Sequence, residues 1–497
     1  MDEKHDNRET LSHREDIAED ASRKGVFAEM HMPDSLRGLS EDEYKKVGRK
    51  ATLKMDIVVF PPLMLMYILN YLDRNNIAAA KLANIQEDLS LSETEFQSCI
   101  SILYAGYIIM QVPSNMILGK LKWPAVYICG AMGVWGVISA AQAAVTNFAG
   151  LMVARFMVGF VEAVFFPGAL YYLSMFYNRK QYAFRAALFY SGSQLGNAIG
   201  GLFAIGILKL DGDHGLAGWR WLFLVEGVLT IGLAVVFALI LPNSLEGVPR
   251  MTELEREWIT WNYQKDQGQQ DDRNEITATQ GLVLALRDIK TWLLLATLYP
   301  VFISAGVTNL FQPVIATLGY SRTITYALSA PPFILCCIAM MATGYNSDRT
   351  GERYYHIVLP LGVTIIANVI AVATLNTGAR YTAMMLMPAS FYAATTVLYS
   401  WMSGTLSQPA PKRASAIAVI ISICNTTNVW TPYLYNGAPR YLAAFAVNLA
   451  AAVLAILMAT VNRIYLTRQN RKLDRGESTG KSGPTPAQLA SGYRYLV

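Results

Sequence analysis

The amino-acid sequence predicts an all-α membrane protein with twelve transmembrane helices arranged in two halves of six. Three observations predict this fold class. Hydrophobic residues make up 53% of the 497 residues and charged residues only 15%, whereas a soluble protein carries roughly 25% charged residues. Apolar segments of about 20 residues, which is the length that a helix needs to cross a hydrocarbon core, recur along the chain. A polar stretch at residues 243–290 divides these segments into six and six.

Each predicted span begins where apolar residues start to dominate and ends at the next polar cluster. We place the spans at residues 57–80, 95–118, 124–145, 148–177, 185–208, 219–242, 291–316, 325–345, 354–375, 381–404, 413–435 and 441–465. The domains that follow are a cytoplasmic N-terminal tail at 1–54, an N-terminal half at 55–242, a cytoplasmic central loop at 243–290, a C-terminal half at 291–465 and a cytoplasmic C-terminal tail at 466–497. The polar tails and the central loop are not expected to form a core of their own.

Positive residues predict the orientation of the chain, because short cytoplasmic loops collect lysine and arginine. Such residues precede the first predicted span, follow the second and the fourth, and recur in the central loop and after the last span. We therefore expect a multi-pass protein of the plasma membrane, monomeric in the lipid bilayer, with both termini in the cytoplasm. The net charge of +5 follows from this pattern and predicts no nucleic-acid partner.

The sequence shows no motif of an enzyme or of a cofactor-binding protein. The first fifty residues lack the apolar segment of a cleaved secretory signal. All five cysteines fall inside predicted spans, where we expect them to pack as small hydrophobic residues. No nucleophile stands beside a base, no histidine or cysteine group has metal-ligand spacing, and no phosphate-binding loop is visible. We therefore expect no enzymatic activity, no cofactor and no metal.

Parts of the second half echo the first. "FRAALFYSGSQLG", after the fourth span, contains Arg185, and "KRASAIAVIISIC", after the tenth, contains Arg413. "WRWLFL" opens the sixth span and "PRYLAAF" opens the twelfth. Internal repeats of this kind are typical of secondary transporters, whose binding site lies between the repeats near the middle of the membrane.

The loop "GYNSDRTGER", residues 344–353, lies between the eighth and ninth spans. We expect Gly344 to allow a neighbouring helix to pack closely. We also expect Asp348, Arg349 and Arg353 to form a charge latch at the cytoplasmic face, which holds one conformation until loading releases it. The alternative is an ordinary solvated turn between two helices.

The first predicted span ends in a polar cluster, "NYLDRNN". The apolar run before it, residues 57–72, reaches about 24 Å, so the helix has to continue through Asp73 and Arg74 to cross a core of about 30 Å. A charge near the middle of the bilayer costs roughly 2.5–3.5 kcal/mol on insertion scales, so both residues are expected to face the bundle interior. Asn70 and Arg74 share a helix face, and Asp73 is turned about 100° away. Alternatively, Asp73 is exposed at a helix end and Arg74 extends outward to the interface.

The fourth predicted span carries a second pair of opposite charges. Arg155 and Glu162 are seven residues apart, so they share a face at about 10 Å along the axis, and Gly159 between them admits a neighbouring helix. With Asp73 and Arg74 they make four intramembrane charges that sum to zero, which is a strong signal of function. We expect each ionised carboxylate to pair with one of the two arginines. The alternative is two structural ion pairs that only fix helix packing, although such pairs stabilise a fold less than apolar packing does.

These motifs are specific in combination. "NYLDRNNIAAAKL", with "QVPSN", "RFMVGFVEAVFFPG", "WRWLFLVEG", "FQPVIATLGY" and the loop at 344–353, resembles the anion:cation symporter family of the major facilitator superfamily, and within it the fungal allantoate permease branch. The resemblance covers about residues 55–465 and implies the major facilitator fold. It also implies proton-coupled symport of a small organic anion, such as a carboxylic vitamin, a ureide or a sugar acid.

The resemblance implies roles for the four intramembrane charges. Asp73 and Glu162 match the proton-coupling acids of the family, and Arg74 and Arg155 match its anion-binding arginines. In such a site, protonation of the acid frees the guanidinium, which then holds the substrate carboxylate by two hydrogen bonds. Proton and anion would therefore bind cooperatively.

Two amides and three aromatic residues are further candidates for the substrate cavity. Gln194 and Asn425 resemble positions that line this cavity in relatives, although Gln and Asn side chains also join transmembrane helices by hydrogen bonds. Phe311, Tyr399 and Trp401 are able to stack on a flat ring, and for each of them simple core packing is the alternative.

Two other functions stay open at this point. One is an exporter or facilitator of a metabolite, in which the same charges recognise an anion without inward proton coupling. The other is a nutrient sensor that binds a ligand and signals through its cytoplasmic segments without transport. A sensor has no need for two intramembrane acids, so the acids at positions 73 and 162 favour a transporter.

Overall fold

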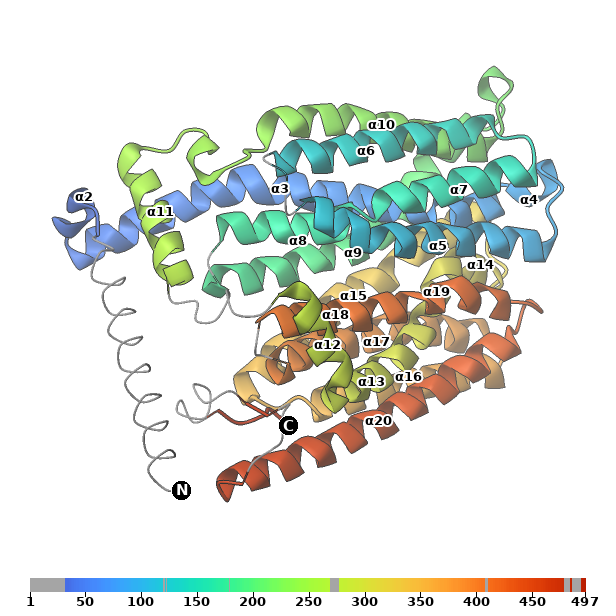
Figure 1. Ribbon diagram of the computed structural model, residues 1–497. Coiled ribbons are helices and arrows are strands. Elements are labelled where there is room, and N and C mark those ends of the chain that lie inside the picture. The colour runs from blue at the N-terminus through green and yellow to red at the C-terminus, as the bar shows by residue number, and fades with distance from the viewer. Residues whose placement is uncertain are drawn as a thin grey trace.

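The structure is a computed structural model that describes residues 32–118, 121, 123–177, 179–268, 277–406, 410–477, 483–484 and 493–497. All regular secondary structure in these residues is helical, as the sequence predicts. Figure 1 shows long helices that run side by side, with the first half in blue to green and the second half in yellow to red. We call the end of the bundle that holds the start of the first long helix and Val497 the terminal face, and the opposite end the distal face.

The two halves contain the same sequence of long helices. The first half consists of α3 (Glu41–Leu82), α5 (Glu93–Leu118), α6 (Pro124–Ala141), α7 (Phe148–Glu162) with α8 (Phe165–Phe176), α9 (Arg179–Ile207) and α10 (Gly218–Ile240). The second half consists of α13 (Ile289–Ala305) with α14 (Phe311–Ala316), α15 (Arg322–Thr350), α16 (Tyr355–Ala373), α17 (Thr377–Thr405), α18 (Ala410–Asn425) with α19 (Thr427–Trp430), and α20 (Leu442–Asp474). Short helices α2 (Asp34–Arg37) and α4 (Ile85–Asp88) lie at the terminal and distal ends of α3.

Ten of the described helices, some of them interrupted, are long and apolar enough to cross a membrane. The predicted spans without a match among these ten correspond to α5 and α17, which are 26 and 29 residues long and pack within the bundle. Both helices contain buried polar residues, such as Gln97 and Ser101 in α5 and Arg380, Ser390 and Thr395 in α17. The lengths of these two helices are consistent with the twelve predicted spans.

Helix α3 begins earlier than the predicted span. It starts at Glu41 because Ser40 and Glu43 form a capping box, in which each side chain bonds to the backbone N–H of the other. The helix then continues through the polar cluster to Leu82, as the length of the apolar run requires. The predicted boundary at residue 54 therefore falls inside a helix.

The fourth span is interrupted, although the sequence predicts a continuous segment. Helix α7 ends at Glu162, and α8 begins at Phe165. Pro167 has no backbone N–H and cannot bond to the carbonyl of Ala163, so the regular hydrogen-bond ladder fails at this point. Irregular backbone inside a membrane protein is tolerated where it is buried in protein or lines a cavity. The break thus places Glu162 at a helix end inside the bundle.

The central segment contains two helices, which the sequence does not predict. Helix α11 (Glu253–Gly268) packs on the first turns of α3, where Gly48 leaves room for the ring of Trp258. Helix α12 (Ala278–Arg287) packs on α18, and Gly281 lies against Pro411. Val248 and Ile259 of this segment are buried in the core cluster of the first half, which agrees with the expectation that the segment forms no core of its own.

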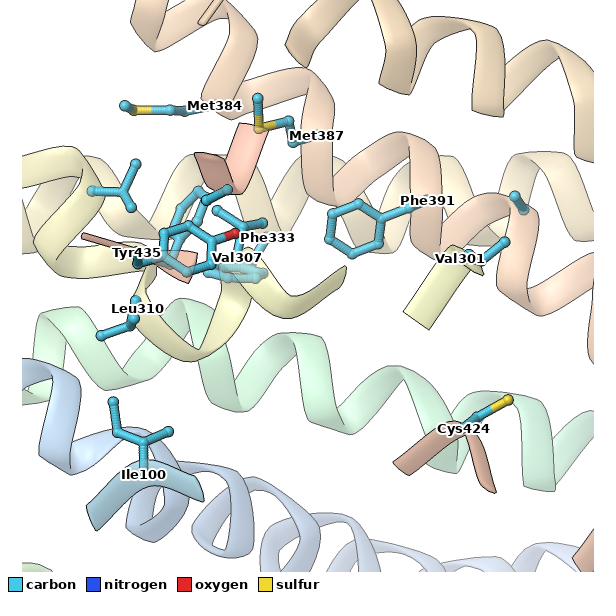
Figure 2. Packing of buried hydrophobic residues seen from close by; sticks show 14 of the residues in the cluster. Ile100, Val301, Val307, Leu310, Phe333, Met384, Met387, Phe391, Cys424 and Tyr435 are labelled. Atoms are coloured by element: carbon cyan, nitrogen blue, oxygen red, sulfur yellow. The ribbon is translucent and has the colours of Figure 1, made fainter. Parts of the chain in front are cut away.

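The hydrophobic core consists of one large cluster that fills the second half and extends into the first, a second cluster within the first half and a small third cluster that includes Ala79 and Tyr326. Figure 2 shows part of the large cluster, where Phe333, Met387 and Phe391 pack together with Val307 and Leu310. All five cysteines are free and buried, as predicted.

Ion pairs at the terminal face repeat in the two halves. In the first half, Asp56 of α3 accepts two hydrogen bonds from Arg185 of α9, each 2.6 Å long. In the second half, Asp288, which precedes α13, lies 2.6 Å from the ammonium of Lys412 in α18. Each pair joins the first and fifth spans of its half, so the repeat predicted from the sequence around Arg185 and Arg413 is also visible in the structure.

Candidate functional site

The centre of the candidate site is an ion pair between α3 and the end of α7. Arg74 Nε donates to Glu162 Oε2 over 2.6 Å. Glu162 is completely buried, and 11% of the Arg74 side chain is exposed. Asn70, one turn before Arg74, faces the same carboxylate, so the predicted shared face of these two residues is confirmed. The guanidinium of Arg74 also lies over the ring of Tyr107, 4.5 Å from its centroid.

Of the two arginines expected to pair with a carboxylate, Arg74 does so, whereas Arg155 makes no ion pair with a described residue. Its guanidinium donates to backbone carbonyls: to Arg74 over 3.0 Å, to Asp73 over 3.3 Å and to Cys99 over 3.4 Å. Arg155 is only 1% exposed. It therefore ties α7 to the backbones of α3 and α5, while Glu162 at the interrupted end of the helix turns to Arg74.

Asp73 points away from both arginine side chains. Its carboxylate accepts hydrogen bonds from Ser139 over 2.8 Å, from Trp135 over 3.1 Å and from Thr230 over 3.4 Å. It is 1% exposed, which excludes the alternative of an exposed residue at a helix end. The expectation that Asp73 pairs with an arginine side chain is wrong, because the 100° turn between neighbouring residues directs Asp73 to α6 and α10.

A small pocket lies between the two halves, next to the polar cluster of α3. Its volume is about 20 Å³, close to the room that one water molecule needs. Its lining combines amides and hydroxyls with apolar side chains from α3, α9, α14, α15 and the residues before α14, and includes Asn75, Asn76, Asn197, Thr308, Phe311, Gln312 and Phe333. Asn75 donates to Asn197 across the pocket wall. The pocket lies between the halves, where the repeat predicts a binding site.

The weaker candidates differ in where they lie. Gln194 is fully buried and accepts a hydrogen bond from Asn197, which lines the pocket. Asn425 is half-buried at the end of α18, where the eleventh span is interrupted. Phe311 lines the pocket, whereas Trp401 is buried in the core and donates to the carbonyl of Leu496. Trp401 is thus a packing residue and not a pocket residue.

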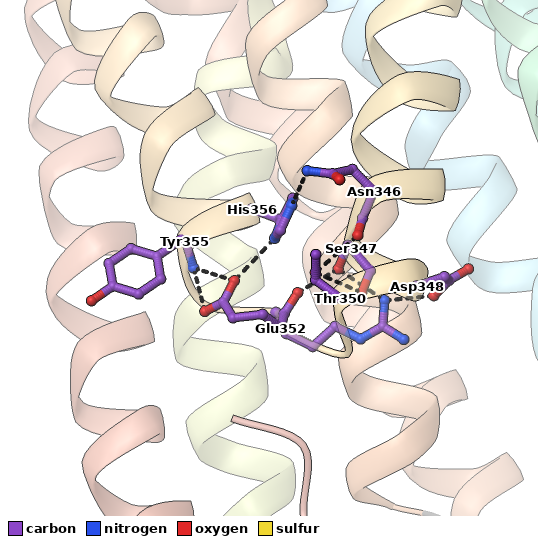
Figure 3. Close-up of polar contacts among 8 residues, drawn as sticks. Asn346, Ser347, Asp348, Thr350, Glu352, Tyr355 and His356 are labelled. Atoms are coloured by element: carbon purple, nitrogen blue, oxygen red, sulfur yellow. Dashed lines mark hydrogen bonds and ion pairs between the residues drawn. The ribbon is translucent and has the colours of Figure 1, made fainter.

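The loop at residues 344–353 forms a network within the second half (Figure 3). Arg353 pairs with Asp348 at 2.7 Å and donates to Ser347 over 2.9 Å. Gly351 adopts a left-handed conformation, with φ of +69°, and ends α15. Arg349 is exposed and makes no ion pair with another described residue. The network joins α15 to α16 and has no described bond to the first half.

Gly344 does not provide the close approach expected of it. A Cβ atom at this position would lie 3.7 Å from Cγ2 of Thr396, which is an ordinary contact. At Gly159, by contrast, a Cβ atom would collide with the backbone carbonyl of Leu103. The prediction that Gly159 admits a neighbouring helix is therefore confirmed, and α5 is that helix.

A third buried acid, Glu226 of α10, belongs to the same region and was not singled out from the sequence. It is 1% exposed and accepts a hydrogen bond from Asn76. The motif "WRWLFLVEG" contains it, and an acid within an apolar span is a functional candidate by default. A search of all spans for ionisable residues would have found it.

The halves are joined near the distal face. Gln97 of α5 donates to Asn436 over 2.7 Å, and Ser98 lies 2.9 Å from the hydroxyl of Tyr433. The hydroxyl of Tyr326 in α15 donates to the carbonyl of Ala79 over 2.8 Å. These hydrogen bonds hold the distal ends of the two halves together.

Two helical halves with buried charges and a pocket between them define a membrane transporter and not an enzyme. A family model described as Major Facilitator Superfamily matches residues 63–432, so the chain belongs to this superfamily. The superfamily and the paired halves confirm the predicted fold class.

Characterised relatives and solved structures resemble the chain over most of its length. The high-affinity nicotinic acid transporter of Saccharomyces cerevisiae is 27% identical over 477 residues, which are 95% of this chain and 88% of the relative. A putative tartrate transporter of Agrobacterium vitis is 29% identical over 432 residues, which are 86% of this chain and 96% of the relative. The xylose transporter XylE of E. coli, in a partially occluded inward-open conformation, shares the fold with a TM-score of 0.63 and 15% identity, over 82% of this chain and 97% of XylE.

Proposed function

We propose that this chain is a proton-coupled symporter of a small organic anion that works by alternating access. The observation that carries the proposal is the buried ion pair of Arg74 and Glu162, whose Nε and Oε2 atoms lie 2.6 Å apart. A guanidinium held by a carboxylate that is able to take up a proton makes proton binding and anion binding depend on each other. The relatives that are named as nicotinic acid and tartrate transporters support an organic acid as the substrate.

Glu162 controls the availability of Arg74 in this mechanism. The ionised carboxylate occupies the guanidinium, and protonation of Glu162 frees it to hold a substrate carboxylate by two hydrogen bonds. When both proton and anion are bound, the charges in the site are compensated. When only one of them is bound, an unpaired charge stays buried, and this opposes passage through the occluded state. Symport follows from this difference.

Loading of the site requires the halves to move. The pocket volume of about 20 Å³ is far below the roughly 300–1,000 Å³ of pockets that bind small molecules. We propose that the halves separate at the terminal face while the distal hydrogen bonds hold. The loop at residues 344–353, in which Arg353 pairs with Asp348, acts as the conformational latch of the second half.

The setting of the protein is part of the proposal. We place the terminal face in the cytoplasm, since Arg468, Arg471 and Lys472 at the end of α20 lie there. The protein acts as a monomer in the plasma membrane, and its domains divide at the boundaries given above, except that the first half begins with α3 at Glu41.

Glu162→Gln tests the proposal, because glutamine resembles the protonated acid but carries no exchangeable charge. We expect proteoliposomes with the original protein to accumulate labelled nicotinate or tartrate when the outside is acidic. The variant should lose this gradient-driven accumulation and keep counterflow exchange. Glu87→Gln, at an exposed position near the distal face, should behave as the original protein does.

Three results would count against this function. Normal pH-dependent accumulation by Glu162→Gln would remove Glu162 from proton coupling. Flux through the original protein that does not change with pH would indicate a facilitator or exporter. Binding of the labelled anion without any counterflow would indicate a sensor.

A further inference from the structure

The buried charges of the first half do not balance. Three buried carboxyls, Asp73, Glu162 and Glu226, share the membrane interior of this half with two guanidiniums, Arg74 and Arg155. An unpaired charge in such an environment costs several kcal/mol, so the group neutralises by taking up a proton. One proton on one of the three carboxyls restores neutrality.

The hydrogen-bond partners of the three carboxyls indicate which of them carries this proton. Glu162 is held directly by Arg74 at 2.6 Å. The oxygens of Asp73 accept hydrogen bonds from three neutral donors, on α6 and α10. Both carboxylates are therefore stabilised in their ionised form.

Glu226 has a single neutral hydrogen-bond donor, whereas Glu162 has the cation of Arg74 and Asp73 has three donors. Asn76 donates to the Oε2 atom of Glu226, whose Oε1 atom is buried without a hydrogen-bond partner among the described residues. Thr230, one turn further along α10, reaches the carboxylate of Asp73 over 3.4 Å. Asp73 and Asn76, one turn apart on α3, therefore contact Thr230 and Glu226, one turn apart on α10, which places the two acids on neighbouring turns of the same helix contact.

The neighbouring elements place no other titratable group against Glu226. Helix α6 contributes Trp135 and Ser139, which do not titrate, and its Tyr127 and Cys129 lie nearer the terminal end of that helix. The short turns beside α10, at 142–144 and 208–210, contain only the exposed Lys209. The part of α9 near α10, residues 195–207, has no ionisable side chain. The acid on the neighbouring turn of α3 is Asp73, whose backbone carbonyl accepts a hydrogen bond from Arg155.

We propose that Asp73 and Glu226 form a proton-binding pair that holds one proton, with Glu226 as its resting place. Transfer of this proton to Asp73 leaves Glu226 ionised, so the pair keeps one negative charge in either form. The pair gives the first half a proton site separate from Glu162. Its part in transport rests on the function proposed above, whereas its occupancy does not.

Infrared spectroscopy of the purified protein tests the occupancy without any substrate. A protonated carboxylic acid has a carbonyl stretch that a carboxylate lacks. We expect this band in the original protein near neutral pH, and its loss in Glu226→Gln. Asp56→Asn removes a carboxylate of the same α3 helix that is paired with Arg185, so this control should keep the band. An undiminished band in Glu226→Gln, or equal loss in the control, would overturn the proposal.

A second variant covers the case in which Glu226→Gln does not fold. Glu226→Asp keeps the acid and moves it, so the band should remain at a shifted frequency; an unshifted band would assign the proton to another residue. In transport, Glu226→Gln should keep counterflow but lose much of the stimulation by external acid, and unchanged stimulation would exclude a role in coupling. If the original protein shows the band but no proton-coupled flux, the proton site stands and the symport function fails.

Discussion

Glu162 lies at the break between α7 and α8, and at this position its carboxylate forms an ion pair with Arg74. The sequence predicts that four charges lie inside the membrane, and all four are buried or nearly so. It does not predict which partners they choose, because the choice depends on where α7 ends and on how α3 is rotated. Seven-residue spacing places Arg155 and Glu162 on one face of α7 but about 10 Å apart along its axis. The guanidinium of Arg155 instead donates to backbone carbonyls of α3 and α5.

Two glycines that look alike in the sequence differ in what surrounds them. We expect Gly159→Ala to destabilise the protein by about 1–3 kcal/mol, because the added methyl group meets the carbonyl of Leu103 and forces α5 and α7 apart. Gly344→Ala should change stability little, since its Cβ atom has room. Thermal unfolding of both variants in detergent gives the comparison. Equal midpoints would contradict the close packing of α5 on α7.

At the scale of elements, the sequence predicts where apolar helices run but not where they are interrupted. Interruptions depend on single residues such as Pro167 and on whether the surrounding protein buries the exposed backbone groups. The helices of the central segment were missed for a related reason. Helix α11 is polar on most of its surface and is held by a few contacts to α3. Its polar composition gives no sign of these contacts in the sequence.

We expect the pairing of α11 with α3 to depend on pH, through Glu255 of α11 and Lys54 of α3. Burial opposes ionisation of Glu255, but hydrogen bonds from Lys54 and from the backbone of Thr252 outweigh it and lower the pKa of this carboxyl. An acid with a lowered pKa stabilises the folded arrangement above its ordinary pKa of about 4.3, and this contribution is lost as the pH falls through the lower folded value. We therefore expect α11 to loosen from α3 in acid.

Spin labels at the exposed positions Lys50 and Arg256 allow this loosening to be measured. The distribution of distances between the two labels should broaden as the pH falls below about 4.3. Glu255→Gln should show the broad distribution at every pH. A narrow distribution that persists in acid would show that the ion pair does not hold the helix.

The segment Tyr493–Val497 is an element of the second half. Tyr495 is 4% exposed; its hydroxyl accepts a hydrogen bond from Lys290 over 3.0 Å, and its backbone forms two hydrogen bonds with Asn470. Trp401 donates to the carbonyl of Leu496 over 2.8 Å. These contacts join α13, α17 and α20 at the terminal face.

We expect Tyr495→Ala to destabilise the protein by about 3 kcal/mol or more, because a large aromatic ring leaves the core. Tyr495→Phe removes only the hydroxyl group and should cost about 1 kcal/mol. Unfolding midpoints of the two variants separate ring packing from hydrogen bonding. Similar midpoints for Tyr495→Ala and the original protein would mean that the segment is not docked in solution.

At the scale of the whole molecule, the two halves and their family are predictable from the sequence, since hydropathy and repeated motifs extend over hundreds of residues. The contacts between the halves are not predictable in this way. They include apolar packing between the halves and scattered polar pairs, such as Gln97 with Asn436, that are far apart in the chain and carry no local pattern.

The distal contacts should control the balance between conformations. Replacing both Gln97 and Ser98 by alanine removes two hydrogen bonds between the halves, each worth about 1 kcal/mol. A loss of about 2 kcal/mol shifts the conformational ratio roughly thirtyfold toward separated distal ends. Spin labels at the exposed Glu87 and Arg440 should report a larger distance in the double variant. An unchanged distance distribution would show that apolar packing alone holds this end.

The two repeated clamps, Asp56 with Arg185 and Asp288 with Lys412, each connect helices of a single half. Neither has to break when one half swings against the other. They therefore make each half more rigid and leave the interface between the halves free for a hinge motion. Weakening one of these ion pairs should reduce how far motion at the terminal face moves the rest of the same half. It should not change which anion is recognised.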